Sequence, residues 1–155
     1  MKVLSIITLD ELTDVLENLV ENDDLEFEYE VNENTDNGHI SIQCKMFDSE
    51  FSITPLGAGP FYEDLLLTAY FGACLDPILL CNDFNTRHSF ASASPFTLES
   101  EEGLDEEDTV IIEVEKLVIL QGGVTDEHIE ATIRLWSGML ILAEELFEGT
   151  PAESE

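Results

Sequence analysis

Histidine and cysteine side chains are the first place to look for chemistry, because they bind transition metals and carry nucleophilic catalysis. The sequence contains three of each, and none stands in an HxxxH, CxxH or CxxC spacing. A zinc site built from His88 and Cys81 with remote ligands is the alternative to free side chains in an apolar core. A cysteine nucleophile would need a general base and an orienting group, which the sequence does not show. The six residues are His39, His88, His128, Cys44, Cys74 and Cys81.

Carboxylates in register are a second candidate site. Glutamates alternate with large apolar residues from Leu25 to Val31, which predicts a strand with the glutamates on one face. Residues on the same face of a strand are spaced about 7 Å apart, so the carboxylates do not converge on one cation. We favour a solvated face that discourages edge-to-edge aggregation, with a cation site as the alternative. The glutamates are Glu26, Glu28 and Glu30.

The segment from Asp76 to Ala93 is dense in polar side chains that could contact a ligand. Asp76 and Pro77 predict the start of a short helix, because an acidic cap followed by proline suits a helix N-terminus. Asn82 and Asn85 predict its end, since asparagine tolerates left-handed geometry and bonds nearby backbone. We therefore expect these asparagines to serve the backbone, with ligand binding as the alternative.

Two further pairs invite a functional interpretation and have a simpler structural one. Asp83 and Arg87 are four residues apart, acid before base, which favours an ion pair on a helix. Gly122 and Gly123 are not followed by Lys-Ser or Lys-Thr, so they do not form a phosphate-binding loop. A tight turn that requires positive φ explains them. From these residues we expect no catalytic residue, no metal and no cofactor.

The charge of the chain limits its partners. Thirty-five acidic residues against five basic ones give a formal net charge of −30. A nucleic acid or an anionic membrane surface is bound through lysines and arginines, so we exclude both as partners. The surface either serves solubility or attracts basic proteins, and mimicry of nucleic acid is a third alternative. The unpaired cysteines, the lack of a signal peptide and the lack of a long apolar run predict a cytoplasmic protein.

The order of the elements predicts the fold class. Thr8 to Glu11 forms a capping box, and the leucine spacing that follows predicts a helix from Leu9 to Val20. Hairpin strands with helices outside them indicate an α+β fold, an antiparallel sheet with an N-terminal helix, a short middle helix and a long C-terminal helix. The acidic run from Glu99 to Asp108 predicts a solvated loop. The strands are expected near 25–31, 40–46, 51–55, 65–71, 89–93 and 110–120. For the continuous apolar run 65–71, part of a helix is the alternative.

The last helix, capped by Thr125, is more apolar than packing on one sheet face requires. Its surplus apolar side chains predict either deep burial or an interface with a second copy of the chain. We favour the interface and expect a homodimer, with deep burial as the alternative. The residues considered for a dimer or partner surface are Leu135, Trp136, Met139 and Leu142.

Two short motifs resemble the YbjN family of bacterial sensory transduction regulators. Asn82-Asp83-Phe84-Asn85, followed by a strand of small residues, is similar to the family's N-x-aromatic-N segment. Leu117 to Thr125 (LVILQGGVT) is similar to its strand, Gly-Gly-Val-Ser/Thr and helix. The order of elements agrees over Thr8 to Phe147. The sequence departs from the pattern by Phe84 where tryptophan is usual, and by the long acidic loop.

The resemblance implies a fold like that of type III secretion chaperones, which are small acidic proteins that dimerise and bind extended segments of partners. It also implies a protein-binding regulator with no reaction and no cofactor. A dedicated secretion chaperone for one exported effector is the alternative. Through the resemblance, Asn82, Phe84, Asn85, Gly122 and Gly123 become family-motif residues with a structural role. We expect a single domain over residues 1–148 and a polar acidic tail over 149–155.

Overall fold

The computed structural model describes residues 3–33, 39–47, 49–57, 59–98 and 109–149. Within these ranges, three α-helices and a six-stranded antiparallel sheet make the α+β fold that the sequence predicts. The helices are α1 (Leu9–Val20), α2 (Pro77–Arg87) and α3 (Asp126–Glu148), with a 3-10 turn η1 (Asp23–Leu25). The strands are β1 (Val3–Leu4), β2 (Glu28–Glu33), β3 (Ile40–Met46), β4 (Ser49–Leu56), β5 (Asp64–Phe71), β6 (Ser92–Leu98), β7 (Thr109–Ile119) and β8 (Val124–Thr125).

The large sheet has the strand order β2-β3-β4-β5-β7-β6, so β2 and β6 are its two edges. β1 and β8 form a separate antiparallel pair in which Val3 is opposite Thr125. The chain divides into two compact units, Met1–Leu67 with Leu117–Met139 and Thr68–Lys116 with Leu140–Glu155. The single domain over residues 1–148 stays a prediction.

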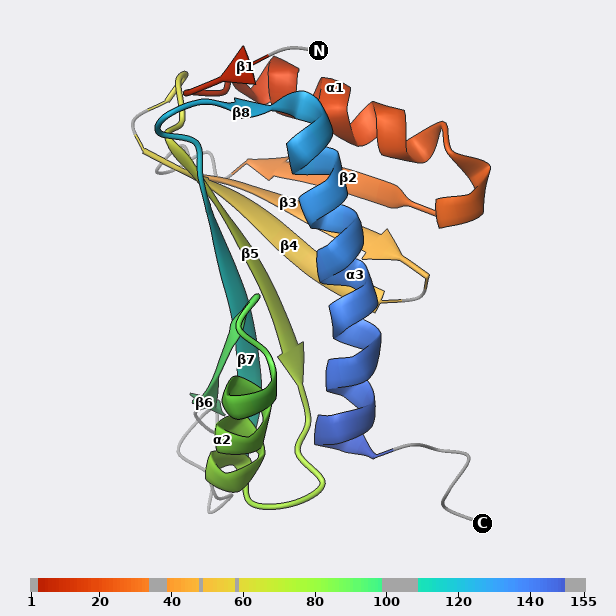
Figure 1. The fold of residues 1–155 in the computed structure, drawn as a ribbon, viewed down its shortest axis with the longest axis vertical. Coiled ribbons are helices and arrows are strands. Elements are labelled where there is room, and N and C mark those ends of the chain that lie inside the picture. Colours follow the sequence, from red (N-terminus) through yellow and green to blue (C-terminus); the bar gives the residue numbers. More distant parts are fainter. Residues whose placement is uncertain (1–2, 34–38, 48, 58, 99–108, 150–155) are drawn as a thin grey trace. The chain divides into compact units, whose positions relative to one another are not determined.

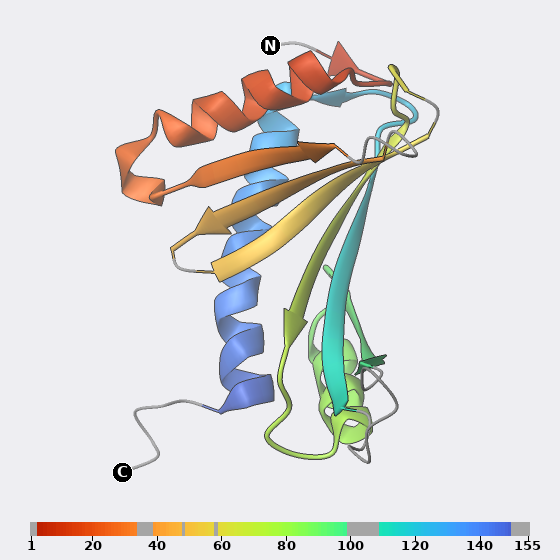
Figure 2. The same cartoon turned by 180° about the vertical axis from the view of Figure 1, so that it is seen from behind.

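The first unit is built on the β2–β3–β4 meander. The first part of α3 crosses one face of these strands, in front of them in Figure 1 and behind them in Figure 2. Trp136 of α3 is fully buried and meets Phe51 of β4 edge-on, with ring centroids 6.1 Å apart. Helix α1 has the predicted bounds and the predicted capping box, with Glu11 N–H donating to Thr8 Oγ1 at 3.1 Å and Thr8 N–H to Glu11 Oε1 at 3.0 Å. Its buried stripe is Leu12, Val15, Leu16 and Leu19.

The second unit is organised around the ring of Phe147, near the end of α3. Phe147 contacts Phe84 of α2 at 5.3 Å and Phe71 of β5 at 5.7 Å between ring centroids. Phe84 and Phe147 are both fully buried. Packed aromatic rings of this size contribute much of the apolar burial that holds a small unit together.

The structure corrects several predicted boundaries. The strand expected to begin at Leu25 begins at Glu28, because η1 and a left-handed Glu26 (φ 49°) come first. The Asn22 side chain accepts from Asp24 N–H at 3.1 Å and caps that 3-10 turn, a local choice that alternation does not reveal. Helix α2 does not end at Asn82 to Asn85 but continues to Arg87.

The strand expected from Ser89 to Ala93 lies instead at Ser92–Leu98 and includes Pro95. Proline is tolerated there because β6 is an edge strand, where a missing N–H need not break a ladder of hydrogen bonds. The strand expected near 51–55 also continues past Pro55, since β4 ends at Leu56. The acidic segment 99–108 and residues 150–155 of the tail lie outside the described residues.

Candidate functional site

The two edges of the sheet differ in how their backbone is satisfied. At β6, the Asn85 side chain takes the place of a neighbouring strand. Its Nδ2 donates to the Ala93 carbonyl at 2.9 Å, and its Oδ1 accepts from Ala93 N–H at 2.8 Å. Ala93 is only 6% exposed, so these two backbone groups would otherwise lack water. Pro95 has no N–H, so a further strand would find an incomplete row of donors.

The β2 edge is open by comparison. Helix α1 lies next to β2 (Figure 1), and Tyr29 Oη donates to Glu17 Oε2 at 2.6 Å. Beyond this contact, each residue from Glu30 to Glu33 is exposed, including Val31 on the core-facing side of the strand. Backbone groups on the free side of an edge strand can pair with another chain. We call Glu30–Glu33 the open edge.

Carboxylates surround the start of this strand. The β2–β3–β4 register places Lys45 opposite both Glu28 and Glu50. A shallow groove of about 340 Å³ covers this face, and Glu30 and Gln43 also line it. Among the residues that the structure describes, no group of three or more His, Cys, Asp or Glu side chains could hold a metal ion.

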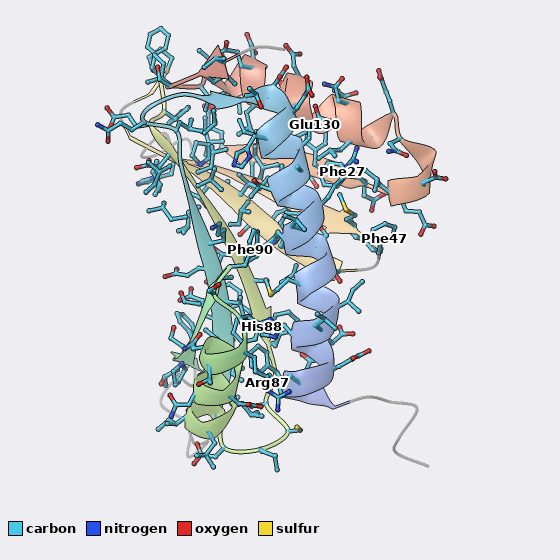
Figure 3. All side chains as sticks on the ribbon, in the orientation of Figure 1. Phe27, Phe47, Arg87, His88, Phe90 and Glu130 are labelled. Atoms are coloured by element: carbon cyan, nitrogen blue, oxygen red, sulfur yellow. The ribbon has the colours of Figure 1, made fainter. Side chains whose placement is uncertain are left out.

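The residues of the Asn82 to Asn85 motif differ in their burial and in their bonding partners. Phe84 faces the core, and its ring centroid lies 4.7 Å from that of His88. His88 follows the last residue of α2 (Figure 3). Asn85 bonds the β6 backbone rather than the end of its own helix, and Asn82 is exposed. The predicted Asp83–Arg87 ion pair is present, with 2.9 Å between Arg87 Nε and Asp83 Oδ1.

Gly122 and Gly123 make the turn between β7 and β8, with φ of +92° and +89°. The Gly123 N–H donates to the Leu120 carbonyl at 2.9 Å. A Cβ at Gly123 would come within 2.9 Å of Val3 Cγ1. Both positive φ and close packing therefore explain glycine here.

The residues considered for a partner surface on α3 separate into two kinds. Trp136 is fully buried and Met139 is 7% exposed, so these two side chains belong to the core. Leu135 and Leu142 are 63% and 53% exposed, and the candidate surface is reduced to them. Leu142 also lines a groove of about 360 Å³ together with Arg87 and His88 of α2. The apolar stripe predicted on this helix was so wide that the sequence alone could not show which of its residues are buried and which are exposed.

Sequence reasoning missed an exposed aromatic pair. Tyr70 of β5 and Phe96 of β6 are 50% and 37% exposed, and their ring centroids are 5.4 Å apart. Tyr70 lies in a continuous apolar run, where the exposed face of a strand is not visible. The pair also depends on strand neighbours that only the fold brings together.

Comparison with known proteins identifies the family. The YbjN family model, described as "Putative bacterial sensory transduction regulator", matches residues 12–148. The chain belongs to the YbjN family. A search of curated proteins and a search of solved structures returned no match. The likeness of this YbjN protein to type III secretion chaperones therefore stays a prediction. Within the described ranges, no helix is both long and apolar enough to cross a membrane.

Asn85→Ala should destabilise this YbjN protein by about 1–3 kcal/mol, because two buried backbone groups of Ala93 would lose their partner. Chemical denaturation followed by circular dichroism measures the change. Asn82→Ala is the matched control, since it makes the same substitution at an exposed position of the same helix. It should change the free energy of unfolding by less than about 0.5 kcal/mol. Equal effects of the two substitutions would contradict the assigned role of Asn85.

The three free cysteines should react at very different rates with a thiol reagent. Cys74 is exposed, whereas Cys44 and Cys81 are buried. Burial raises the pKa of the Cys44 thiol to about 12 and also raises the pKa of Cys81, so little reactive thiolate forms at neutral pH. Ellman's reagent should modify one thiol rapidly in the native protein and the others only on unfolding. Cys74→Ser should remove the rapid phase, and a rapid phase that persists would place the reactive thiol elsewhere.

Proposed function

We propose that this protein is a non-enzymatic cytoplasmic regulator that acts by binding a segment of a partner protein along the open edge of β2. The main observation behind this proposal is that Glu30–Glu33 are exposed on β2, an edge strand of the sheet. An extended segment that pairs there gains backbone hydrogen bonds, and the alternate side chains supply specificity. The family's description as regulators of sensory transduction agrees with a binding role.

Charge selects which segment the edge accepts. Glu28, Glu30 and Glu33 all lie on β2, and no basic residue does. A second copy pairing through the same strand would bring glutamates against glutamates, which is unfavourable across a strand pair. A partner segment with lysine or arginine would place opposite charges across the pair instead. The net charge of −30 would also speed the encounter with such a basic partner.

Two neighbouring proline variants test the edge. Successive N–H groups of a strand point to opposite sides. Of the variants Val31→Pro and Asn32→Pro, one therefore removes an N–H that bonds to β3. The other removes an N–H that points outward from the edge of the sheet. Thermal unfolding identifies the outward position, because that variant should keep its melting temperature within a few degrees. Affinity capture from the source cell with mass spectrometry should then recover less of the partners with this variant than with the unaltered protein. Equal recovery would count against binding at β2.

We also propose that the protein is a homodimer whose subunits meet through the exposed side of α3. Leu135 is a large aliphatic side chain on α3 that is 63% exposed. A contact between copies would remove this apolar surface from water. The three free cysteines suit a reducing cytoplasm, where such an assembly would be held without disulfides.

Light scattering at micromolar concentration should give a mass twice the 17.3 kDa of the chain. Leu135→Glu should convert the dimer to a monomer without unfolding it, since the side chain is exposed. Ile78→Glu is the control, because Ile78 is 60% exposed on α2 and the substitution adds the same charge. A single 17.3 kDa species from the unaltered protein would end the dimer proposal.

A further inference from the structure

The exposed rings of Tyr70 and Phe96 form the centre of a patch on one face of the second unit. Strand β7 lies between β5 and β6, and Phe96 is opposite Ile111 in the β6–β7 register. The two rings therefore meet over β7, at an interplanar angle of 62° and with 5.4 Å between centroids. Exposed large apolar groups that gather in one place commonly mark a contact surface. We call Tyr70, Phe96, Ile111, Glu113 and Glu115 the aromatic patch.

Two carboxylates give this patch a negative potential. Tyr70 Oη donates to Glu113 Oε2 at 2.9 Å, and Glu115 follows two residues later on the same face of β7. Partial burial, the bond to Glu113 and the charges of both glutamates raise the pKa of Tyr70 to about 12. The phenol therefore stays neutral at physiological pH, and its ring keeps its attraction for cations.

The opposite face of β7 shows how this unit pairs a cation with an aromatic ring. Lys116 lies there, with its Nζ 4.6 Å from the centroid of the Phe90 ring. Lys116 is the one basic residue in the sequences of β5, β6 and β7. Because Lys116 lies on the opposite face, the aromatic patch has two rings and two carboxylates but no lysine or arginine from its own strands on its own face.

We propose that the aromatic patch binds a lysine or arginine side chain presented by a basic segment of a partner protein. The ammonium or guanidinium group would lie over the exposed face of Tyr70 or Phe96, within reach of the Glu113 carboxylate. This inference rests on the proposed protein-binding function but uses different strands from the β2 edge. A second copy of the chain is a poor occupant, since it has five basic residues against 35 acidic ones.

A peptide of alternating lysine and proline is a suitable probe, because its prolines favour the polyproline II conformation and leave half of its residues without an N–H, which disfavours pairing with a sheet edge. Added to the full-length protein, it should shift the ring proton signals of Tyr70 and Phe96 in NMR spectra. The apparent affinity should fall as salt is raised. A peptide of alternating glutamine and proline should leave the same signals unchanged. Shifts with both peptides, or with neither, would overturn the proposal.

Substitutions then separate cation binding from simple apolar contact. Tyr70→Leu and Phe96→Leu keep apolar bulk but remove the ring, and each should weaken binding of the lysine peptide about two- to fivefold. Tyr70→Phe keeps the ring and should bind nearly as well as the unaltered protein. Phe61→Leu is the control, because Phe61 is an exposed aromatic residue outside the patch. Equal binding by the leucine variants would refute a role of the rings.

The experiments on the aromatic patch can fail or succeed independently of those on the open edge of β2. If the outward proline variant of β2 loses its cellular partners while the patch variants bind the lysine peptide normally, this inference fails and the proposed function stands. If the patch variants lose the lysine peptide while the proline variant keeps its partners, the patch stands and the edge does not. A change of oligomeric state in Phe96→Leu would identify the patch as a contact between copies, which contradicts the proposal.

Discussion

An open sheet cannot satisfy the backbone groups at its two edges by itself, and this constraint explains the arrangement of polar residues in the protein. At β6 the chain itself satisfies the edge, because the side-chain amide of Asn85 bonds the N–H and carbonyl of Ala93. Pro95 has no N–H that would need a partner. At β2 the outward groups from Glu30 to Glu33 are left to solvent or to a partner. The difference matters because an unprotected edge normally favours aggregation.

In the proposed function, charge keeps the open edge from pairing with a second copy of the same strand. Glutamates on β2 face water and repel a second copy of the strand, yet they do not repel a basic segment. In the proposed function, the same glutamates therefore oppose self-pairing and select the partner. The same principle applies to the aromatic patch, where Glu113 and Glu115 flank exposed rings that would otherwise be a plain apolar surface. We propose that acidic residues beside apolar ones favour basic partners at both places.

The residues that carry the YbjN resemblance serve the fold. Phe84 fills the core of its unit against Phe147, Asn85 joins α2 to β6, and Gly123 allows the approach of Val3. Each of these roles depends on a side-chain shape that few other residues offer. The proposed binding surfaces lie elsewhere, on β2, on the exposed side of α3 and on the aromatic patch.

The sequence by itself determined the fold class, the bounds of α1 and its capping box, and the glycine turn before α3. These features depend on residues within a few positions of one another, so spacing and side-chain chemistry suffice to predict them. Tertiary structure decided that α2 continues through Asn85, because the partner of that amide is the backbone of Ala93 on a separate strand. It also decided that Trp136 and Met139 are core while Leu135 is exposed, and that Tyr70 meets Phe96. Burial and strand neighbours arise from contacts between distant segments, which no local pattern records.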